Sequence, residues 1–296
     1  MPDPDHSFAL CLTHDVDRPY KTWAQSAYYA LAERDPAHLT SLRPGTRPYW
    51  QFERIMRLED ELGVRSAFYF LNEPHLFGQG PSVWTDPTRW IQHLGRYDLA
   101  RPEIVDVIHA LDEGGWEVGL HGSYGSYADP DRLASETRVL ESVLGHGVDG
   151  VRQHYLNLDG TDTWRAQREL GFNYDASLGS ATEYGFANGY GVHRPFDDEF
   201  VTFPLTAMEV ALPDPGESFE RAATECDRLV EEAADNDAVM TVLWHPRFFN
   251  EQEFPGFGRL YRHLVEQAKE RGAWVGPPGE LYESLGPERL SRPAFA

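Results

Sequence analysis

Short β-rich runs alternate with amphipathic stretches along this chain, and that alternation limits the folds it can adopt. The runs that predict strands are Phe8–Asp15, Ser66–Asn72, Trp116–Gly122, Gly150–Tyr155, Tyr174–Gly179, Phe200–Leu205 and Ala238–His245. The predicted helices are Gln51–Leu62, Pro102–Glu113, Asp131–Leu144, Thr161–Leu170, Glu217–Ala234 and Arg259–Arg271. Strands that alternate with helices are typical of a parallel sheet or barrel. Seven strands in this order predict an α/β barrel with one irregular or missing unit.

The length of 296 residues allows one large domain or two smaller ones. Apolar residues make up 41% of the chain, and no Ser/Gly-rich linker, low-complexity run or internal repeat divides them. Single barrels reach this size. We therefore expect one domain over residues 1–296, with a core from about residue 8 to 276 and a short C-terminal tail.

The charge balance excludes several classes of partner. Lys plus Arg number 26 against 48 Asp plus Glu, a net charge of −22, and Lys21 and Lys269 are the only lysines. Such a composition is typical of proteins that work in concentrated salt, where a Debye length of about 3 Å at 1 M screens the repulsion among carboxylates. An ordinary acidic cytosolic enzyme is the alternative. In both cases the acidic surface repels phosphate backbones and anionic lipids, so we expect no nucleic-acid or membrane partner.

Cysteine usage and the N-terminus favour a cytoplasmic protein. Cys11 and Cys226 have no paired spacing, which predicts two buried free thiols in a reducing compartment. Residues Met1 to His6 are polar and lack the hydrophobic region of a signal peptide. No apolar run approaches the roughly 20 residues of a membrane helix, so we expect no membrane insertion.

Side chains alternate between the two faces of a strand, which separates a helix-facing side from a barrel interior. The predicted interior set is Cys11, Thr13, Asp15 and Asp17 in the first strand, Glu117, Gly119 and His121 in the third, Arg152 and His154 in the fourth, and Asp175, Ser177 and Gly179 in the fifth. His14 falls on the helix-facing side, which predicts a structural histidine. The interior polar residues gather at the carboxyl ends of the strands, where barrel enzymes place their active sites.

Five motifs carry a resemblance to a known family. They are Leu12-Thr13-His14-Asp15-Val16-Asp17, Gly119-Leu120-His121-Gly122-Ser123-Tyr124, Val151-Arg152-Gln153-His154-Tyr155, Tyr174-Asp175-Ala176-Ser177-Leu178-Gly179 and Leu243-Trp244-His245-Pro246. In this order they resemble the polysaccharide deacetylases (NodB homology, carbohydrate esterase family 4), over roughly residues 8 to 250. The subgroup that the chain is most similar to carries Leu-Thr-His-Asp-Val-Asp and Arg-Gln-His-Tyr and is associated with surface-glycan biosynthesis.

The resemblance implies a distorted (β/α)7 barrel with a divalent metal ion, commonly zinc, that activates water against an acetyl group. Asp15 would be the general base and Asp17 the metal-bound carboxylate. His121 aligns with the first histidine of the family's metal-binding pair, but Gly125 occupies the position of the second. Because a catalytic zinc generally has three protein ligands, we predict that His154 replaces the missing one. The alternative is that His154 only packs or binds substrate.

The same resemblance implies four further roles. Arg152 would orient the base, and the backbone N–H of Tyr155 would help to bind the oxyanion of the tetrahedral intermediate. His245 would be the general acid that protonates the leaving amine, and Asp175 would tune this histidine. An insertion over Glu73–Ala100 carries aromatic residues that either pack on the barrel or stack on sugars: Phe77, Trp84, Trp90 and Tyr97.

Three functions are compatible with these features. The first is a metal-dependent hydrolase, a carbohydrate deacetylase, that removes acetyl groups from an N-acetylated or O-acetylated sugar or glycan. The second is a catalytically weak or inactive barrel that binds glycan, which the glycine at position 125 favours. The third is another amide hydrolase on a similar barrel. The identity of the sugar and the oligomeric state remain open at this stage.

Overall fold

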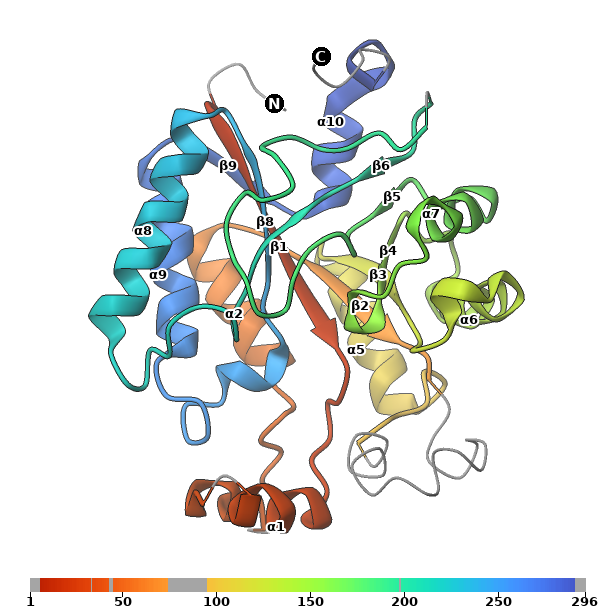
Figure 1. Cartoon of the computed structure of the whole chain (residues 1–296). Helices are drawn as coiled ribbons and strands as arrows, with labels where there is room; N and C mark the ends of the chain where they lie inside the picture. Colours follow the sequence, from red (N-terminus) through yellow and green to blue (C-terminus); the bar gives the residue numbers. More distant parts are fainter. Residues whose placement is uncertain (1–5, 33, 43–44, 74–94, 197, 291–296) are drawn as a thin grey trace.

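The computed structural model describes residues 6–32, 34–42, 45–73, 95–196 and 198–290. Its centre is one sheet in the order β6-β5-β4-β3-β2-β1-β8-β7, with β9 pairing the first half of β1, and every ladder is parallel. The strands are β1 Phe8–Val16, β2 Ala67–Leu71, β3 Glu117–Gly122, β4 Gly150–Gln153, β5 Tyr174–Asp175, β6 Val201–Thr202, β7 Leu205–Met208, β8 Val239–Leu243 and β9 Ala273–Gly276. The sheet curls with helices around it (Figure 1), as the predicted barrel requires.

The barrel is irregular where the two ends of the sheet meet. Backbone bonds across this region come from the segment that follows β5: Leu205 N donates to Leu178 O at 2.7 Å, and Gly185 N donates to Thr206 O at 2.8 Å. In the described chain no ladder pairs β6 with β7. Single backbone bonds from the chain between β5 and β6, rather than a ladder, therefore bridge this part of the barrel.

Helices surround the sheet, and most of them cover its outer face (Figure 1). They are α1 Trp23–Ala32, α2 Phe52–Leu62, α5 Pro102–Glu113, α6 Pro130–Leu144, α7 Gly160–Glu169, α8 Phe219–Asp235, α9 Phe257–Glu270 and α10 Pro278–Leu290, with short 3₁₀ turns η1 Pro36–Leu42, η3 Ser126–Ala128, η4 His154–Leu156 and η5 Pro246–Phe249. Side chains cap the amino ends of α6 and α8, where Asp129 accepts a bond from Arg132 N and Ser218 accepts one from Arg221 N. None of the described helices is long and apolar enough to cross a membrane.

The apolar side chains form two layers, one between sheet and helices and one inside the barrel. The inner layer lies towards the amino ends of the strands and includes Ala9, Cys11, Tyr69, Tyr174 and Leu281. Leu281 belongs to α10. The core therefore does not end at about residue 276 as predicted, because the chain continues as a helix that packs against the barrel. The carboxyl ends of the strands hold the polar residues instead.

The predicted alternation is wrong in the fifth strand. Tyr174 faces the interior, where its hydroxyl lies 2.9 Å from that of Tyr69, while Asp175 faces helix α7. The two tyrosine rings occupy space that side chains would otherwise fill: a Cβ on Gly119 would lie 2.4 Å from the Tyr69 ring, and one on Gly150 2.1 Å from Tyr174. Bulky residues were expected outside, but here glycines on neighbouring strands make room for them inside.

Most predicted elements are present, with differences at their ends. The strand expected over Gly150–Tyr155 stops at Gln153 and continues as the turn η4. The sequence reading did not predict β7, β9, α1 or α10. Tyr97 packs, since its hydroxyl donates to Val16 O at 2.7 Å and accepts from Leu71 N at 2.9 Å. Phe77, Trp84 and Trp90 lie outside the described residues.

Candidate metal centre and active site

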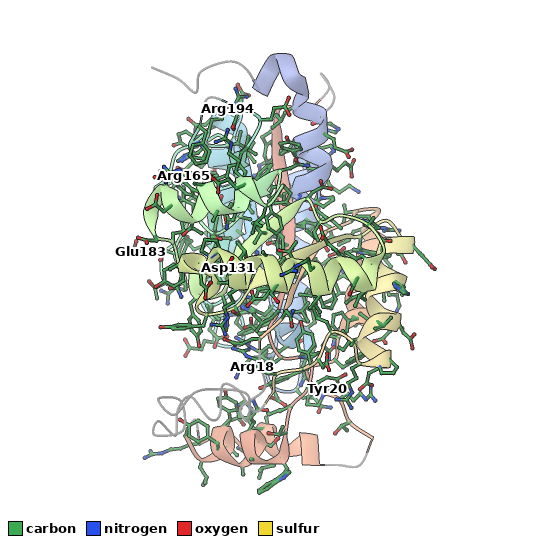
Figure 2. All side chains as sticks on the ribbon, turned by 90° about the vertical axis from the view of Figure 1, so that its right-hand side faces the viewer. Arg18, Tyr20, Asp131, Arg165, Glu183 and Arg194 are labelled. Carbon is green, nitrogen blue, oxygen red and sulfur yellow. The ribbon has the colours of Figure 1, made fainter. Side chains whose placement is uncertain are left out.

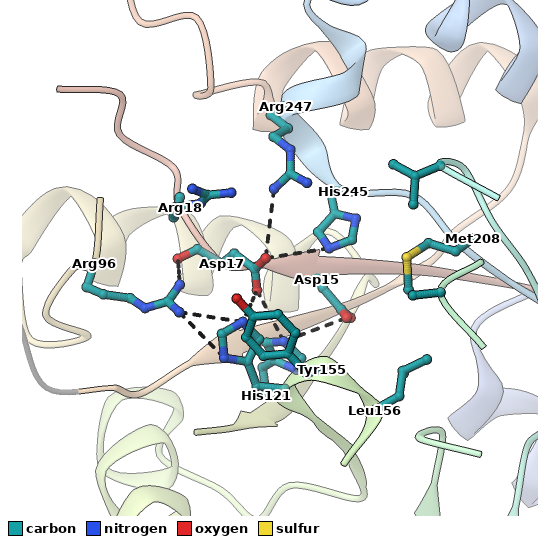
Figure 3. Close-up of a pocket in the computed structure, with 13 residues that line it drawn as sticks. Asp15, Asp17, Arg18, Arg96, His121, Tyr155, Leu156, Met208, His245 and Arg247 are labelled. Carbon is teal, nitrogen blue, oxygen red and sulfur yellow. Dashed lines mark hydrogen bonds and ion pairs between the residues drawn. The ribbon is translucent and has the colours of Figure 1, made fainter. Parts of the chain in front are cut away.

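A pocket opens at the carboxyl ends of β1, β3, β4 and β8, with a volume of about 210 Å³. Figure 3 shows it with 13 lining residues: Asp15, Asp17, Arg18, Arg96, His121, His154, Tyr155, Leu156, Ala181, Met208, Val210, His245 and Arg247. Six of them are among the eight site residues that the sequence predicted, and the other two predicted residues are Arg152 and Asp175. Strand ends that are far apart in the chain therefore bring the predicted chemistry into one cavity.

The carboxylate of Asp17 lies among three imidazoles. Its Oδ1 is 3.2 Å from His121 Nε2 and 3.5 Å from His154 Nε2, and its Oδ2 is 3.5 Å from His245 Nε2. Oδ1 is buried, yet it accepts no hydrogen bond of good geometry from any described residue. A buried oxygen without a partner normally costs free energy, so Asp17 Oδ1 is a candidate ligand atom.

Asp17, His121 and His154 meet the requirements of a metal site. One ligand atom from each lies within 4.8 Å of the others. One carboxylate and two imidazoles are ligands that divalent transition metals prefer, and three protein ligands leave a position for water or substrate. The second nitrogen of His121, Nδ1, is 2.9 Å from the carbonyl of Arg152, the residue opposite it in the β3–β4 ladder. Such a bond fixes the ring so that Nε2 points into the site.

Protonation of the three residues differs. Burial alone would raise the pKa of Asp17, but the imidazoles around it hold that pKa well below the usual range. Burial lowers the pKa of His154 well below its usual value, and nearby Arg96 lowers it further against the opposing charge of Asp17. Burial also disfavours charge on His121, but Asp15 and Asp17 raise its pKa. The lowered pKa values of Asp17 and His154 favour the forms that ligate a metal, a carboxylate and a neutral imidazole, whereas the raised pKa of His121 means that protons compete with a metal there.

Asp15 lies beside this cluster and is held by an arginine, as predicted. Arg152 Nη1 donates to Asp15 Oδ1 at 2.9 Å and to Thr13 Oγ1 at 2.8 Å, and Arg152 Nε donates to the carbonyl of Ala176 at 2.8 Å. The other oxygen of Asp15, Oδ2, is 3.7 Å from His121 Nε2. All of these groups are buried. One carboxylate oxygen is therefore fixed and the other faces the metal cluster.

His245 follows β8 and has a different partner from the predicted one. Its Nδ1 lies 2.7 Å from Glu209 Oε1, while Nε2 faces Asp17. Asp175 does not reach this histidine: it accepts bonds from Trp164 Nε1 at 3.1 Å and Gln167 Nε2 at 2.9 Å on α7. The expectation that Asp175 tunes His245 is wrong, because the fifth strand turns that carboxylate out of the barrel. Glu209 lies beside His245 in the position that was expected for Asp175.

Tyr155 lies at the mouth of the pocket in an unusual backbone conformation. Its φ of 60° is in the left-handed region, and the next residue, Leu156, has a φ of 56°. Each such residue costs of order 1–2 kcal/mol unless its surroundings impose it, and such strain concentrates at functional sites. The Tyr155 ring packs on His154 at 4.4 Å between centroids and stays 53% exposed. It is available to a ligand that enters the pocket.

Sequence reasoning assigned no role to four charged residues of this site. Glu209 follows β7, which was not predicted, and Arg96 lies within the insertion over Glu73–Ala100, so neither had a predicted strand end to mark it. Arg18 and Arg247 each directly follow a predicted motif, Arg18 after Asp17 and Arg247 after His245-Pro246. Charged residues that flank strand-end motifs were the available signal.

Comparison with known proteins supports the fold. No protein-family model and no curated protein matches the chain. A protein from Mycobacterium smegmatis assigned as a polysaccharide deacetylase has a similar structure, with a TM-score of 0.62 and 19% identity over 100% of this chain and 96% of that one. For one from Pseudomonas aeruginosa assigned in the same way, the TM-score is 0.57 and the identity 14%, over 95% and 91% of the two chains.

A third similar structure is the chitin deacetylase of the fungal pathogen Colletotrichum lindemuthianum, with a TM-score of 0.52 and 15% identity over 94% of this chain and 88% of that one. Identities this low establish architecture rather than activity. The predicted barrel class is therefore confirmed, and the chain has the distorted barrel fold of the polysaccharide deacetylases.

Proposed function

We propose that this protein is a metal-dependent carbohydrate deacetylase that removes acetyl groups from an N-acetylated or O-acetylated sugar or glycan. One observation carries the proposal: the Asp17–His121–His154 cluster shares a pocket with a carboxylate fixed by arginine and a histidine fixed by glutamate. A divalent metal held by the cluster, for which we propose Zn²⁺, would supply a Lewis acid for the acetyl carbonyl and lower the pKa of water.

Asp15 is the general base in this proposal. Its Oδ1 is bound to Arg152, so Oδ2 is the oxygen that takes a proton from the attacking water. The buried guanidinium of Arg152 keeps this carboxylate in one orientation, and the bond to Ala176 O keeps the guanidinium in place. A base in a fixed position contributes roughly 10²–10⁴ in rate.

His245 is the general acid. Because Nδ1 lies against Glu209, Nε2 is the nitrogen that faces the pocket and can donate a proton to the leaving nitrogen or oxygen. The carboxylate of Glu209 also stabilises the imidazolium before that transfer, as in other His–carboxylate pairs. The backbone N–H of Tyr155 is proposed as a donor to the oxyanion.

Acetate release from acetylated sugars by the zinc-loaded protein tests this assignment. Asp15→Asn and His245→Ala should each lower the release by roughly 10²–10⁴ without unfolding the chain. His263→Ala is a matched control, because His263 also pairs with a carboxylate, Asp227 at 2.8 Å, but on helix α9. Near-parental release by both site variants would exclude the assignment.

The alternative is a barrel that binds glycan without cleaving it. In that case the parent protein would bind acetylated sugars with no acetate released from any of them. The missing histidine at position 125 motivated this alternative, and the place of His154 beside Asp17 and His121 weakens it.

We also propose that the acidic surface adapts the chain to concentrated salt. Of its two lysines, Lys21 is buried in an ion pair with Glu253 at 2.6 Å. Excess carboxylates repel one another when salt does not screen them. The midpoint of thermal unfolding should therefore rise between about 0.1 and 3 M KCl, and a midpoint that does not move would contradict this part of the proposal.

A further inference from the structure

Three arginines enter the pocket of a chain whose net charge is −22: Arg18, Arg96 and Arg247. The proposed chemistry uses none of them, since Arg152 is the residue that holds the base. Positive charge gathered in one cavity of an otherwise acidic protein indicates that the cavity selects for negative charge.

Arg96 has a structural explanation. Its Nε lies 2.6 Å from Glu73 Oε2, and its Nη1 donates to the backbone carbonyl of Asp17 at 3.2 Å. These contacts neutralise the guanidinium and hold the end of β1 in place. Arg96 therefore belongs to the support of the metal cluster.

Arg247 and Arg18 are less fully engaged. Arg247 Nη1 lies 3.8 Å from Asp17 Oδ2, beyond hydrogen-bond distance, and the guanidinium packs over the Phe248 ring at 4.9 Å. Arg18 donates from Nη1 to the Tyr29 hydroxyl at 3.0 Å, a neutral partner. Figure 2 shows Arg18 between the end of the sheet and helix α1. Both are partly buried, so their charges are only partly solvated.

The two arginines share one carboxylate with the imidazoles. Figure 3 shows Arg18 and Arg247 on the side of Asp17 that faces away from His121. Asp17 Oδ1 faces His121 and His154, the other two residues of the cluster. Asp17 Oδ2 faces His245 and Arg247. The single negative charge of Asp17 cannot neutralise two guanidiniums, and a cation bound to Asp17 would take up that charge as well. An anion from the substrate would restore the balance.

We infer that Arg18 and Arg247 bind an oxyanion of the substrate, a phosphate or carboxylate, so that the acetylated sugar is an acidic one. This rests on the proposed deacetylase function. Guanidinium groups suit this task because they present paired N–H donors that match phosphate and carboxylate oxygens. The half-buried position strengthens each contact by excluding water.

Equilibrium binding to the Asp15→Asn protein in molar KCl tests the inference without requiring turnover. The probes are N-acetylglucosamine, its 1-phosphate and N-acetylmuramic acid, which separate a neutral sugar, a phosphate and a carboxylate. At least one acidic sugar should bind about 10- to 100-fold more tightly than the neutral one. Because the Debye length is then about 3 Å, such a preference reports direct contact rather than long-range attraction.

Adding Arg247→Gln should reduce that preference to less than about a third, and Arg247→Lys should retain part of it. Arg168→Gln is the matched control, because Arg168 also packs over a phenylalanine, Phe196 at 5.1 Å, and pairs with an aspartate, Asp198, far from the pocket. Equal binding of all three sugars, or a preference that Arg247→Gln leaves intact, would overturn the inference. A preference for an acidic sugar that Arg247→Gln reduces, together with no acetate release by the parent, would instead count against the deacetylase function alone.

Discussion

Two buried carboxylates meet histidines on opposite sides of β1, and their bonding differs. Glu59 of α2, on the helix-facing side, lies 3.0 Å from His14 Nε2 and accepts bonds from the Tyr261 hydroxyl at 2.6 Å, Ser66 Oγ at 2.9 Å and Trp116 Nε1 at 2.7 Å. Each oxygen has two partners, and the residue is fully buried. His14 is thus the structural histidine that the strand alternation predicted.

Asp17, on the interior side of the barrel, has fewer hydrogen bonds of good geometry. Its contacts to imidazoles are 3.2–3.5 Å long, Oδ1 accepts no hydrogen bond of good geometry from the described residues, and the group lines a pocket. A polar cluster whose hydrogen bonds are all made gives a rigid and specific core. An incomplete cluster gains free energy when a ligand supplies the missing bonds. The carboxylate with fewer good bonds is therefore the one for which we propose a function. The predictions below follow from this comparison.

The largest effect is expected from Asp17→Asn. Acetate release should fall by about 10³-fold, because a Lewis acid stabilises the transition state by several kcal/mol and an amide is a poor ligand for it. Metal-free Asp17→Asn protein should lose far less unfolding free energy than Glu59→Ala, although the lowered pKa of Asp17 means that its charge contributes some stability. A large loss of stability in the metal-free form would show that Asp17, like Glu59, serves mainly to hold the fold.

The opposite result is expected at the other carboxylate. Glu59→Ala leaves its four buried partners without their carboxylate, and should lower the free energy of unfolding by about 3–5 kcal/mol. Urea denaturation measures it. Glu61→Ala, on the same helix but paired at the surface with Arg262, should change stability by less than about 0.5 kcal/mol. Equal effects of the two variants would remove the distinction between the two sites.

A third carboxylate gives a smaller effect that depends on pH. Glu117 is inside the barrel, where burial raises its pKa to about 7 even though Tyr174 and Gly279 N donate to it. The folded state therefore keeps a proton that the unfolded state loses near the ordinary pKa of 4.5. Stability from this group is present below pH 4.5 and is lost as the pH rises to about 7, by about 3 kcal/mol.

Glu117→Gln should remove this loss, since an amide does not ionise. The difference in unfolding free energy between variant and parent should therefore grow in favour of the variant from pH 5 to pH 8. Urea denaturation at both pH values measures that difference. A difference that stays constant over this range would mean that Glu117 is ionised at both.

The sequence predicted those parts of the site that depend on strand alternation over long strands. Asp15 lies in the nine-residue β1, Asp17 follows it directly, and His121 is the second-last residue of the six-residue β3, so period 2 placed them correctly. His154 was predicted from a missing ligand and does lie beside Asp17. These residues follow from local rules because a long ladder fixes the face of each side chain.

The failures come from short or unrecognised elements. Asp175 belongs to a strand of two residues, too short for alternation to fix its face, and the interior tyrosines turned it outwards. Glu209 follows β7, which packing creates beside β8 from a stretch with weak strand signals. Glu73, the first residue of the insertion over Glu73–Ala100, pairs with Arg96 near its other end. Such long-range contacts cannot be read from local pattern.

The central claim is that Asp17, His121 and His154 hold one divalent metal ion. X-ray absorption spectroscopy of the zinc-loaded protein tests it most directly. The account predicts one zinc per chain with two histidine nitrogens at about 2.0–2.1 Å and one carboxylate oxygen at a similar distance, and a single histidine in His154→Ala. A parent protein that binds no zinc, or a zinc whose histidine count is unchanged in His154→Ala, would contradict it.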